Sequence, residues 1–217
     1  MVGKSNSVRI NSLPGVRRLP FYLNILRRMR NGQPKIISAV ALAEEAGQAV
    51  SVVKKDIEMT GAVGKTGVGY EVAALIGGIE KFLGWTEPCD AFLLGVGNLG
   101  SALLGYGGFR RYGLRFVASF DVDQSKVGSF VHGVEVFPPA KIAELARKLG
   151  AKTGVLTVPA EHAQESARIF VDSGMTRIWS FAPIPLTVPD GVIVQREDLT
   201  AGLAELMVRC RNAGRGS

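Results

Sequence analysis

Three glycines at fixed spacing constrain the fold of this chain more than any other feature. They follow the apolar run 91–94 and precede a stretch with helical periodicity. Gly95 permits a tight turn, Gly97 lets a pyrophosphate approach the backbone, and Gly100 lets the helix pack closely on the strand. Backbone N–H groups at the helix start would then face the phosphates. The pattern predicts a dinucleotide-binding loop formed by Gly95, Val96, Gly97, Asn98, Leu99 and Gly100.

Two acidic residues stand at the end of the next expected strand. Asp121 lies roughly 20 residues beyond the glycines, where Rossmann-type domains place the acid that accepts the ribose hydroxyl hydrogens. Its charge would repel a 2′-phosphate, so the sequence favours NAD(H) over NADP(H). We also expect Asp123 and Lys126 to contact the cofactor. Lys126 either softens this preference as a nearby cation or is a solvated lysine at a helix start.

From residue 90 onward the pattern alternates strands and helices. Nearly continuous apolar strands separated by helices are typical of a parallel sheet covered on both faces, which is the α/β class. Expected strands span 90–94, 114–120, 153–158, 177–181 and 191–194, and expected helices span 99–112, 139–149, 160–173 and 200–211. Two apolar loops at the carboxyl edge of this sheet either line the nicotinamide pocket or only terminate strands. Their residues are Thr157, Val158, Pro159, Phe181, Ala182 and Pro183.

Most of the positive charge lies in the N-terminal part. Residues 1–83 carry 12 Lys and Arg against 6 Asp and Glu, a net charge of +6, whereas residues 84–217 carry 14 against 13. Such a field can attract a polyanion such as DNA, although basic faces are often only solvated.

Helical periodicity in this basic part predicts a helix-turn-helix. An amphipathic helix over 17–30 is followed by a helix over 39–46 and, after the cap candidate Ser51, by a helix over 52–60. A tight turn at Gly47 separates the last two helices.

The second helix of such a unit is the one that can enter a major groove. Lys54 and Lys55 lie on its expected outer face, whereas Val53 and Ile57 can face inward. We therefore expect Ser51, Lys54 and Lys55 to contact DNA. A helical hairpin in a small all-helical domain explains the same pattern.

Glycines at positions 61, 64, 67 and 69 predict a hairpin directly after this helix. A hairpin in that place is typical of the wing of a winged helix. Its tip would be Lys65, Thr66 and Gly67, which can reach a phosphate or a minor groove. A further helix over 73–83 would pack back on the domain or join a partner chain.

Other functions find little support in the sequence. No apolar stretch is long enough to cross a bilayer and no secretion signal is present, so we expect a cytoplasmic protein without membrane contact. Cys89 and Cys210 have no neighbours at metal-ligand spacing, so no metal is expected. The histidines, His132 and His162, look like surface residues, so no catalytic residue is expected.

The ordered motifs resemble the Rex family of redox-sensing transcriptional repressors along nearly the whole chain. The resemblance implies a homodimer with swapped C-terminal helices, NADH bound near the dimer interface, and palindromic operator DNA held by paired winged helices. It is carried by residues 18–23, 53–57, 67–70, 95–100, 120–123, 156–160, 163–164, 181–183 and 198–199.

The same resemblance implies a polar switch. Arg18, Tyr106 and Asp198 match the family's switch residues, which reorganise near the nicotinamide when NADH binds, so Tyr106 and Asp198 count among the expected cofactor contacts. Alternative roles are a helix-surface arginine, a packed tyrosine and an N-cap aspartate. Two departures from the family are Ser180, where many members have Asn, and residues 58–60, Glu-Met-Thr, in the recognition helix.

The sequence thus predicts five segments. They are a flexible N-terminus (1–15), a winged-helix DNA-binding domain (16–83), a linker (84–89), a Rossmann domain for NADH or NAD⁺ (90–197) and a swapped C-terminal helix (198–217). We expect a repressor that senses the NADH/NAD⁺ ratio and leaves its operator when NADH binds. An NAD-dependent oxidoreductase with a basic assembly domain and a DNA-binding protein stabilised by the nucleotide remain alternatives.

Overall fold

The computed structural model describes residues 13–30 and 35–213. The chain divides into two compact units, Met1–Glu87 and Pro88–Ser217, and the division falls within the segment 84–89 expected as a linker. Of the expected flexible N-terminus, residues 1–12 lie outside the described residues and residues 13–15 are helical.

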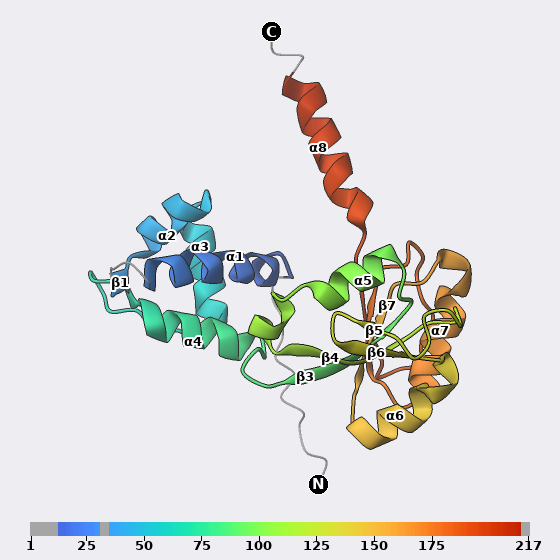
Figure 1. Cartoon of the computed structure of the whole chain (residues 1–217). Helices are drawn as coiled ribbons and strands as arrows, with labels where there is room; N and C mark the ends of the chain where they lie inside the picture. Colours follow the sequence, from blue (N-terminus) through green and yellow to red (C-terminus); the bar gives the residue numbers. More distant parts are fainter. Residues whose placement is uncertain (1–12, 31–34, 214–217) are drawn as a thin grey trace. The chain divides into compact units, whose positions relative to one another are not determined.

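The first unit is a helical domain with a two-stranded sheet (Figure 1). Helix α1 (Leu13–Arg30) packs against α2 (Ala39–Ala46), α3 (Val50–Met59) and α4 (Val72–Phe82). Apolar side chains at helical spacing on each helix form one buried core, because burying these stripes against each other removes them from water. This core includes Leu19, Tyr22, Leu23, Leu26, Leu42, Val53, Ile57, Leu75, Ile76 and Ile79.

Helices α2 and α3 form the expected helix-turn-helix, with one correction. The left-handed conformation of Gly47, φ +60°, ends α2. Helix α3 begins at Val50 rather than at residue 52, and its N-cap is Ala49, which makes no side-chain capping bond. Ser51 therefore lies inside the helix and is not its cap.

The hairpin after α3, residues 61–71 (the wing), pairs differently from a simple two-stranded ribbon. Strand β2 (Tyr70–Glu71) pairs antiparallel with β1 (Ile36–Ile37), a strand that the sequence did not indicate. Within the wing itself, Lys65 and Gly69 form an isolated bridge around Gly67, whose φ is +75°. A side chain at Gly69 would collide with the carbonyl of Ile37, so this position requires glycine.

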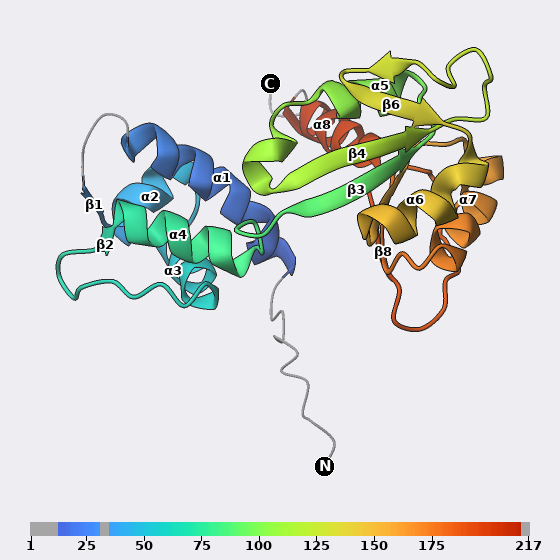
Figure 2. The same cartoon turned by 60° about the horizontal axis from the view of Figure 1, so that its bottom comes forward.

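The second unit is a Rossmann-type sheet of order β5-β6-β4-β3-β7-β8-β9. Figure 2 shows its neighbouring strands β6, β4 and β3. All neighbouring strands are parallel except β5 and β6. The strands are β3 (Cys89–Leu94), β4 (Leu114–Phe120), β5 (Phe130–Val131), β6 (Val134–Phe137), β7 (Thr153–Leu156), β8 (Arg177–Ser180) and β9 (Ile193–Arg196). The hairpin of β5 and β6 was not predicted.

Helices cover both faces of this sheet, as the apolar strands required. Helices α6 (Ile142–Leu149) and α7 (Ala160–Asp172) bury Ile142, Ala146, Ala167 and Phe170 on one face. Helix α5 (Asn98–Gly105) buries Leu104 on the other face. A 3₁₀ turn, η2 (Pro139–Lys141), leads into α6.

The helix after the glycine loop is shorter than expected, and the last helix is exposed along its whole length. The helix expected over 99–112 ends at Gly105, because Tyr106 is extended, and a 3₁₀ turn η1 (Phe109–Tyr112) follows. Gly105, Gly107 and Gly108 are the sequence signal for this early end of the helix. The last helix, α8 (Leu199–Ala213), leaves all its side chains exposed. Within the described residues, no helix is long and apolar enough to cross a membrane.

Candidate functional site

A cavity of about 620 Å³ lies at the carboxyl edge of the sheet, where open parallel sheets bind ligands. The ends of β3, β4, β7 and β8 and the first turns of α7 line it. The expected cofactor contacts that line it are Gly95, Gly97, Leu99, Asp121, Lys126, Thr157, Val158, Pro159 and Phe181. Those that do not line it are Val96, Asn98, Gly100, Asp123, Ala182, Pro183, Tyr106 and Asp198.

The glycine loop has the geometry that its spacing indicated. Gly95 has φ +104° and donates its N–H to the carbonyl of Phe120 at 2.8 Å. An added Cβ at Gly100 would collide with the carbonyl of Gly95, whereas one at Gly97 would meet open space. Thr157 holds the loop from β7 by donating its hydroxyl to the Gly95 carbonyl at 2.7 Å. The loop thus leaves the approach to Gly97 free for a phosphate group.

Asp121 is bound by the loop as well as facing the cavity. Its Oδ2 accepts the N–H of Val96 at 2.7 Å and its Oδ1 accepts the N–H of Asp123 at 2.9 Å. Only 8% of the residue is exposed. The sequence placed Asp121 at the ribose end but gave no sign that Val96 would be one of its partners.

Lys126 is neither isolated nor simply solvated. Its Nζ lies 3.2 Å from Oδ2 of Asp121 and 3.6 Å from Oδ2 of Asp123. Hydrogen bonds from the hydroxyl and the N–H of Ser125 lower the pKa of Asp123, with a smaller contribution from the Lys126 charge.

An aromatic row adjoins the other side of the cavity. The rings of Phe181 and Trp179 lie 4.9 Å apart, those of Trp179 and Phe109 5.5 Å, and those of Phe109 and Tyr106 4.8 Å. Ser180 is fully buried, and its hydroxyl accepts the N–H of Ala182 at 3.3 Å. Ser180 therefore holds the turn that presents Phe181 to the cavity.

Sequence reasoning missed the contribution of α7. His162, which the sequence suggested was a surface histidine, is exposed but lines the cavity. The signal was its position: a helix that follows a strand at the carboxyl edge turns its first residues toward that edge. The other missed lining residues are Leu94, Val122, Pro139, Glu165, Ser166 and Ile169.

The expected DNA contacts lie on exposed surfaces of the first unit. Ser51, Lys54 and Lys55 are exposed on α3, while Val53 and Ile57 are buried, as their spacing predicted. Lys65, Thr66 and Gly67 are all exposed at the wing tip.

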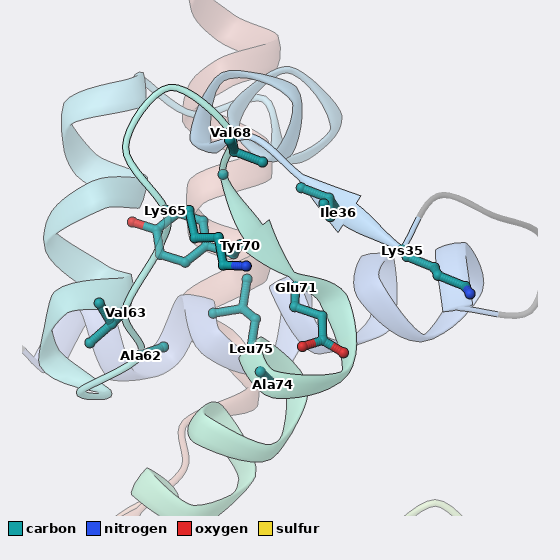
Figure 3. Close-up of a pocket in the computed structure, with 11 residues that line it drawn as sticks. Lys35, Ile36, Ala62, Val63, Lys65, Val68, Tyr70, Glu71, Ala74 and Leu75 are labelled. Atoms are coloured by element: carbon teal, nitrogen blue, oxygen red, sulfur yellow. The ribbon is translucent and has the colours of Figure 1, made fainter.

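A second cavity, of about 400 Å³, opens beside this tip (Figure 3). The wing, β1 with the preceding Lys35, and the start of α4 line it. Lys65 and Lys35 are its cationic lining residues, and Val63 and Val68 are exposed apolar ones.

Arg18 is bound to α3 by a buried carboxylate. Its Nε and Nη2 donate to the two oxygens of Asp56 at 2.6 and 2.8 Å, and the hydroxyl of Tyr22 donates to Oδ2 at 2.9 Å. Burial, and then the hydrogen bond to Asp56, raise the pKa of Tyr22 to about 12. The hydrogen bond to Asp56 raises the pKa of Arg18 further above its already high value.

The other two expected switch residues make contacts elsewhere. Tyr106 is 57% exposed, and Asp198 caps α8 by accepting the N–H and hydroxyl of Thr200 at 2.9 and 2.6 Å. These hydrogen bonds lower the pKa of Asp198. Arg18 belongs to the first unit and the other two to the second, so their joint action stays a prediction. Among the described residues, no group of His, Cys, Asp and Glu could hold a metal ion.

Comparisons with known proteins assign this arrangement to a family. A model described as "CoA binding domain" matches residues 86–184. The redox-sensing transcriptional repressor Rex of Treponema denticola is 42% identical over 200 residues, which cover 92% of this chain and 95% of that protein. The chain belongs to the Rex family. Rex of Bacteroides thetaiotaomicron is 38% identical over 90% of this chain and 89% of its own.

Solved structures of the Rex family share both units of this chain. The structure of RSP in complex with β-NAD⁺ and operator DNA superimposes with a TM-score of 0.87 at 31% identity, covering 94% of each chain. RSP in complex with β-NADH gives a TM-score of 0.85 at 29% identity, covering 94% of this chain and 96% of that one. These matches confirm the Rex resemblance, the Rossmann-type sheet and the winged-helix N-terminus predicted from the sequence.

Proposed function

We propose that this Rex-family chain is a transcriptional repressor that senses the NADH/NAD⁺ ratio and leaves its operator when NADH binds. The observation that carries the proposal is the match over 94% of the chain to RSP, seen once with β-NAD⁺ and operator DNA and once with β-NADH. The relatives are named repressors, so we propose that this chain has no enzymatic activity. We also propose that it acts in the cytoplasm, where a repressor can reach DNA.

The cofactor would lie in the cavity at the carboxyl edge of the sheet. Its pyrophosphate would meet the N–H groups at the start of α5, next to the open face of Gly97. Asp121 would accept the ribose hydroxyl hydrogens while its bond to Val96 keeps the carboxylate in place. The remaining expected contacts, from Asn98 to Pro183, would close around the two halves of the cofactor.

Preference for NADH over NAD⁺ would come from the apolar end of the cavity. The oxidised nicotinamide ring carries a positive charge and the reduced ring does not. Transfer of that charge from water to the apolar lining around Val158, Pro159 and Phe181 carries a desolvation penalty, so the neutral ring binds better. We propose that Pro183 and Tyr106, which lie outside this lining, approach the ring only when the cofactor is bound.

DNA would be held by α3 and the wing. Lys54 and Lys55 are exposed on α3 and can pair with phosphates, while the wing tip adds Lys65. The likeness to a Rex family structure with operator DNA supports this assignment. A palindromic operator needs two copies of the domain at a fixed spacing.

The second copy would come from a homodimer formed through α8. This helix carries a stripe of exposed large apolar side chains, each more than half exposed, and such a stripe is stabilised when a partner covers it. The stripe comprises Leu199, Leu203, Leu206 and Met207. We propose that the helices swap between subunits.

NADH would act by changing the spacing of the two domains. A ligand shifts an equilibrium only through different affinities for two states, so NADH must bind the DNA-incompetent dimer more tightly. We propose that Arg18, Tyr106 and Asp198 exchange partners in this transition.

The decisive experiment is a fluorescence anisotropy titration of the purified protein on a labelled palindromic operator, repeated with NADH and with NAD⁺. We expect NADH to weaken operator binding and NAD⁺ to leave it nearly unchanged. Equal effects of the two cofactors would contradict redox sensing, and no effect of either would indicate that the nucleotide only stabilises the fold.

A further inference from the structure

We propose that Asp123 sets the cofactor specificity of this chain by occupying Lys126, so that this ammonium group cannot receive a 2′-phosphate. The inference rests on the proposed NAD(H) site and names the residue that distinguishes NADH from NADPH there.

Three charges meet at the end of β4. Asp121 is the fixed member, since two backbone N–H groups hold its two oxygens and only 8% of the residue is exposed. Lys126 and Asp123 are the adjustable members, with side chains 37% and 46% exposed. The Nζ of Lys126 stands 3.2 Å from Asp121 and 3.6 Å from Asp123.

The backbone between the two adjustable residues is fixed. The N–H of Lys126 donates to the carbonyl of Asp123 at 3.0 Å, which brings the side chains i and i+3 together. Oδ1 of Asp123 accepts the N–H and the hydroxyl of Ser125, and its Oδ2 faces Lys126. One carboxylate oxygen thus anchors Asp123 while the other engages the lysine.

This arrangement decides the charge that a 2′-phosphate would meet. NADPH carries the extra phosphate on the ribose that Asp121 would bind. Two carboxylates and one ammonium group sum to one negative charge, which opposes an incoming phosphate dianion. Without the charge of Asp123 the sum is zero, and Lys126 keeps only one carboxylate partner. The lysine can then turn toward the phosphate.

The test uses Asp123→Asn, which keeps an oxygen acceptor for Ser125 and removes only the charge. We expect its affinity for NADPH, measured by calorimetry on the full chain, to rise about tenfold, the size of one partly exposed charge interaction. Its affinity for NADH should stay within about threefold of wild type. In a Lys126→Met background the same Asp123→Asn substitution should give no gain over Lys126→Met alone, because the gain acts through Lys126.

Glu144→Gln is the matched control. Glu144 pairs with Lys141 at the same i,i+3 spacing, at 2.7 Å, and does not line the cavity. It should leave the affinities for both cofactors unchanged.

Two results would overturn the inference alone, provided that the wild type binds NADH and NADH releases the operator. One is an unchanged NADPH affinity in Asp123→Asn; the other is a gain that survives Lys126→Met, which would mean that Asp123 acts by repulsion only. Absence of NADH binding in the wild type would instead overturn the proposed function, and this inference with it.

Discussion

The carboxylate of Asp121 accepts the N–H of Val96 at 2.7 Å, which joins the end of β4 to the loop that follows β3. These residues are 25 positions apart in sequence, yet the bond places the acid for the ribose and the loop for the pyrophosphate in one rigid unit. Binding of the ribose by Asp121 and binding of the pyrophosphate by the loop would therefore be coupled.

Asp121→Asn should weaken NADH binding. It removes a charged acceptor and a partner of Lys126, and hydrogen bonds to charged groups contribute about 1.5–3 kcal/mol, so the dissociation constant should rise about 10- to 100-fold. Fluorescence of bound NADH measures this. Operator affinity without NADH should be unchanged. Asp90→Asn, which removes a carboxylate paired with Arg115 outside the cavity, should bind NADH normally.

Asp56→Asn should destabilise the first unit. Asp56 is 2% exposed and accepts three hydrogen bonds, so the substitution leaves Arg18 without its counter-charge. Breaking a buried pair costs about 3–5 kcal/mol, and the partial exposure of Arg18 puts the expected loss at the lower end of that range, which urea unfolding would detect. The more exposed pair of Arg27 and Glu80 provides the comparison: Glu80→Gln should cost about 1 kcal/mol or less. Equal losses would contradict the special role of Asp56.

Alkaline pH should destabilise the same unit through Tyr22. Its pKa is about 12 in the folded chain against an ordinary value of 10.0, so the folded state retains the proton more strongly. The stabilisation is complete below pH 10 and is lost as the pH rises toward 12. Unfolding free energies measured from pH 8 to 12 should fall more steeply in the wild type than in Tyr22→Phe. Parallel curves would refute this effect.

Lys54→Ala should weaken operator binding and leave NADH binding intact. An exposed lysine that neutralises one phosphate contributes to the salt-dependent part of the DNA-binding free energy. The magnitude of the slope of log K against log salt should therefore fall by about one for each lysine removed from the complex. Anisotropy titrations at several salt concentrations give both quantities. Lys148→Ala, which replaces an exposed lysine on α6, should change neither quantity. An unchanged slope for Lys54→Ala would mean that Lys54 does not neutralise a phosphate.

Leu206→Glu should dissociate the proposed homodimer. The substitution places a charge within the apolar stripe of α8, where a partner would bury it at a cost of several kcal/mol. Analytical ultracentrifugation should show monomers and anisotropy should show weaker operator binding. Ala201→Glu, on the opposite face of the same helix, should remain dimeric. A dimeric Leu206→Glu would mean that α8 does not form the interface.

Local sequence determined the parts of this protein whose conformation depends on a few neighbouring residues. The spacing of Gly95, Gly97 and Gly100 predicted the loop because two of the demands are local: Gly95 adopts φ +104°, and Gly100 packs against the carbonyl of Gly95. Continuous apolar runs predicted β3, β4 and β7, and Val53 with Ile57 predicted the buried face of α3. The end of α5 at Gly105 is also a local feature, because the glycines at 105, 107 and 108 follow one another closely in the sequence.

Only the tertiary structure decided which distant groups meet. It paired Arg18 with Asp56, 38 residues away, and Asp121 with Val96; it placed His162 at the cavity and added the two-residue strands β1 and β5 to their partners. Periodicity fixes which face of an element is apolar. It cannot fix the partner of a polar side chain, because that partner depends on how whole elements pack.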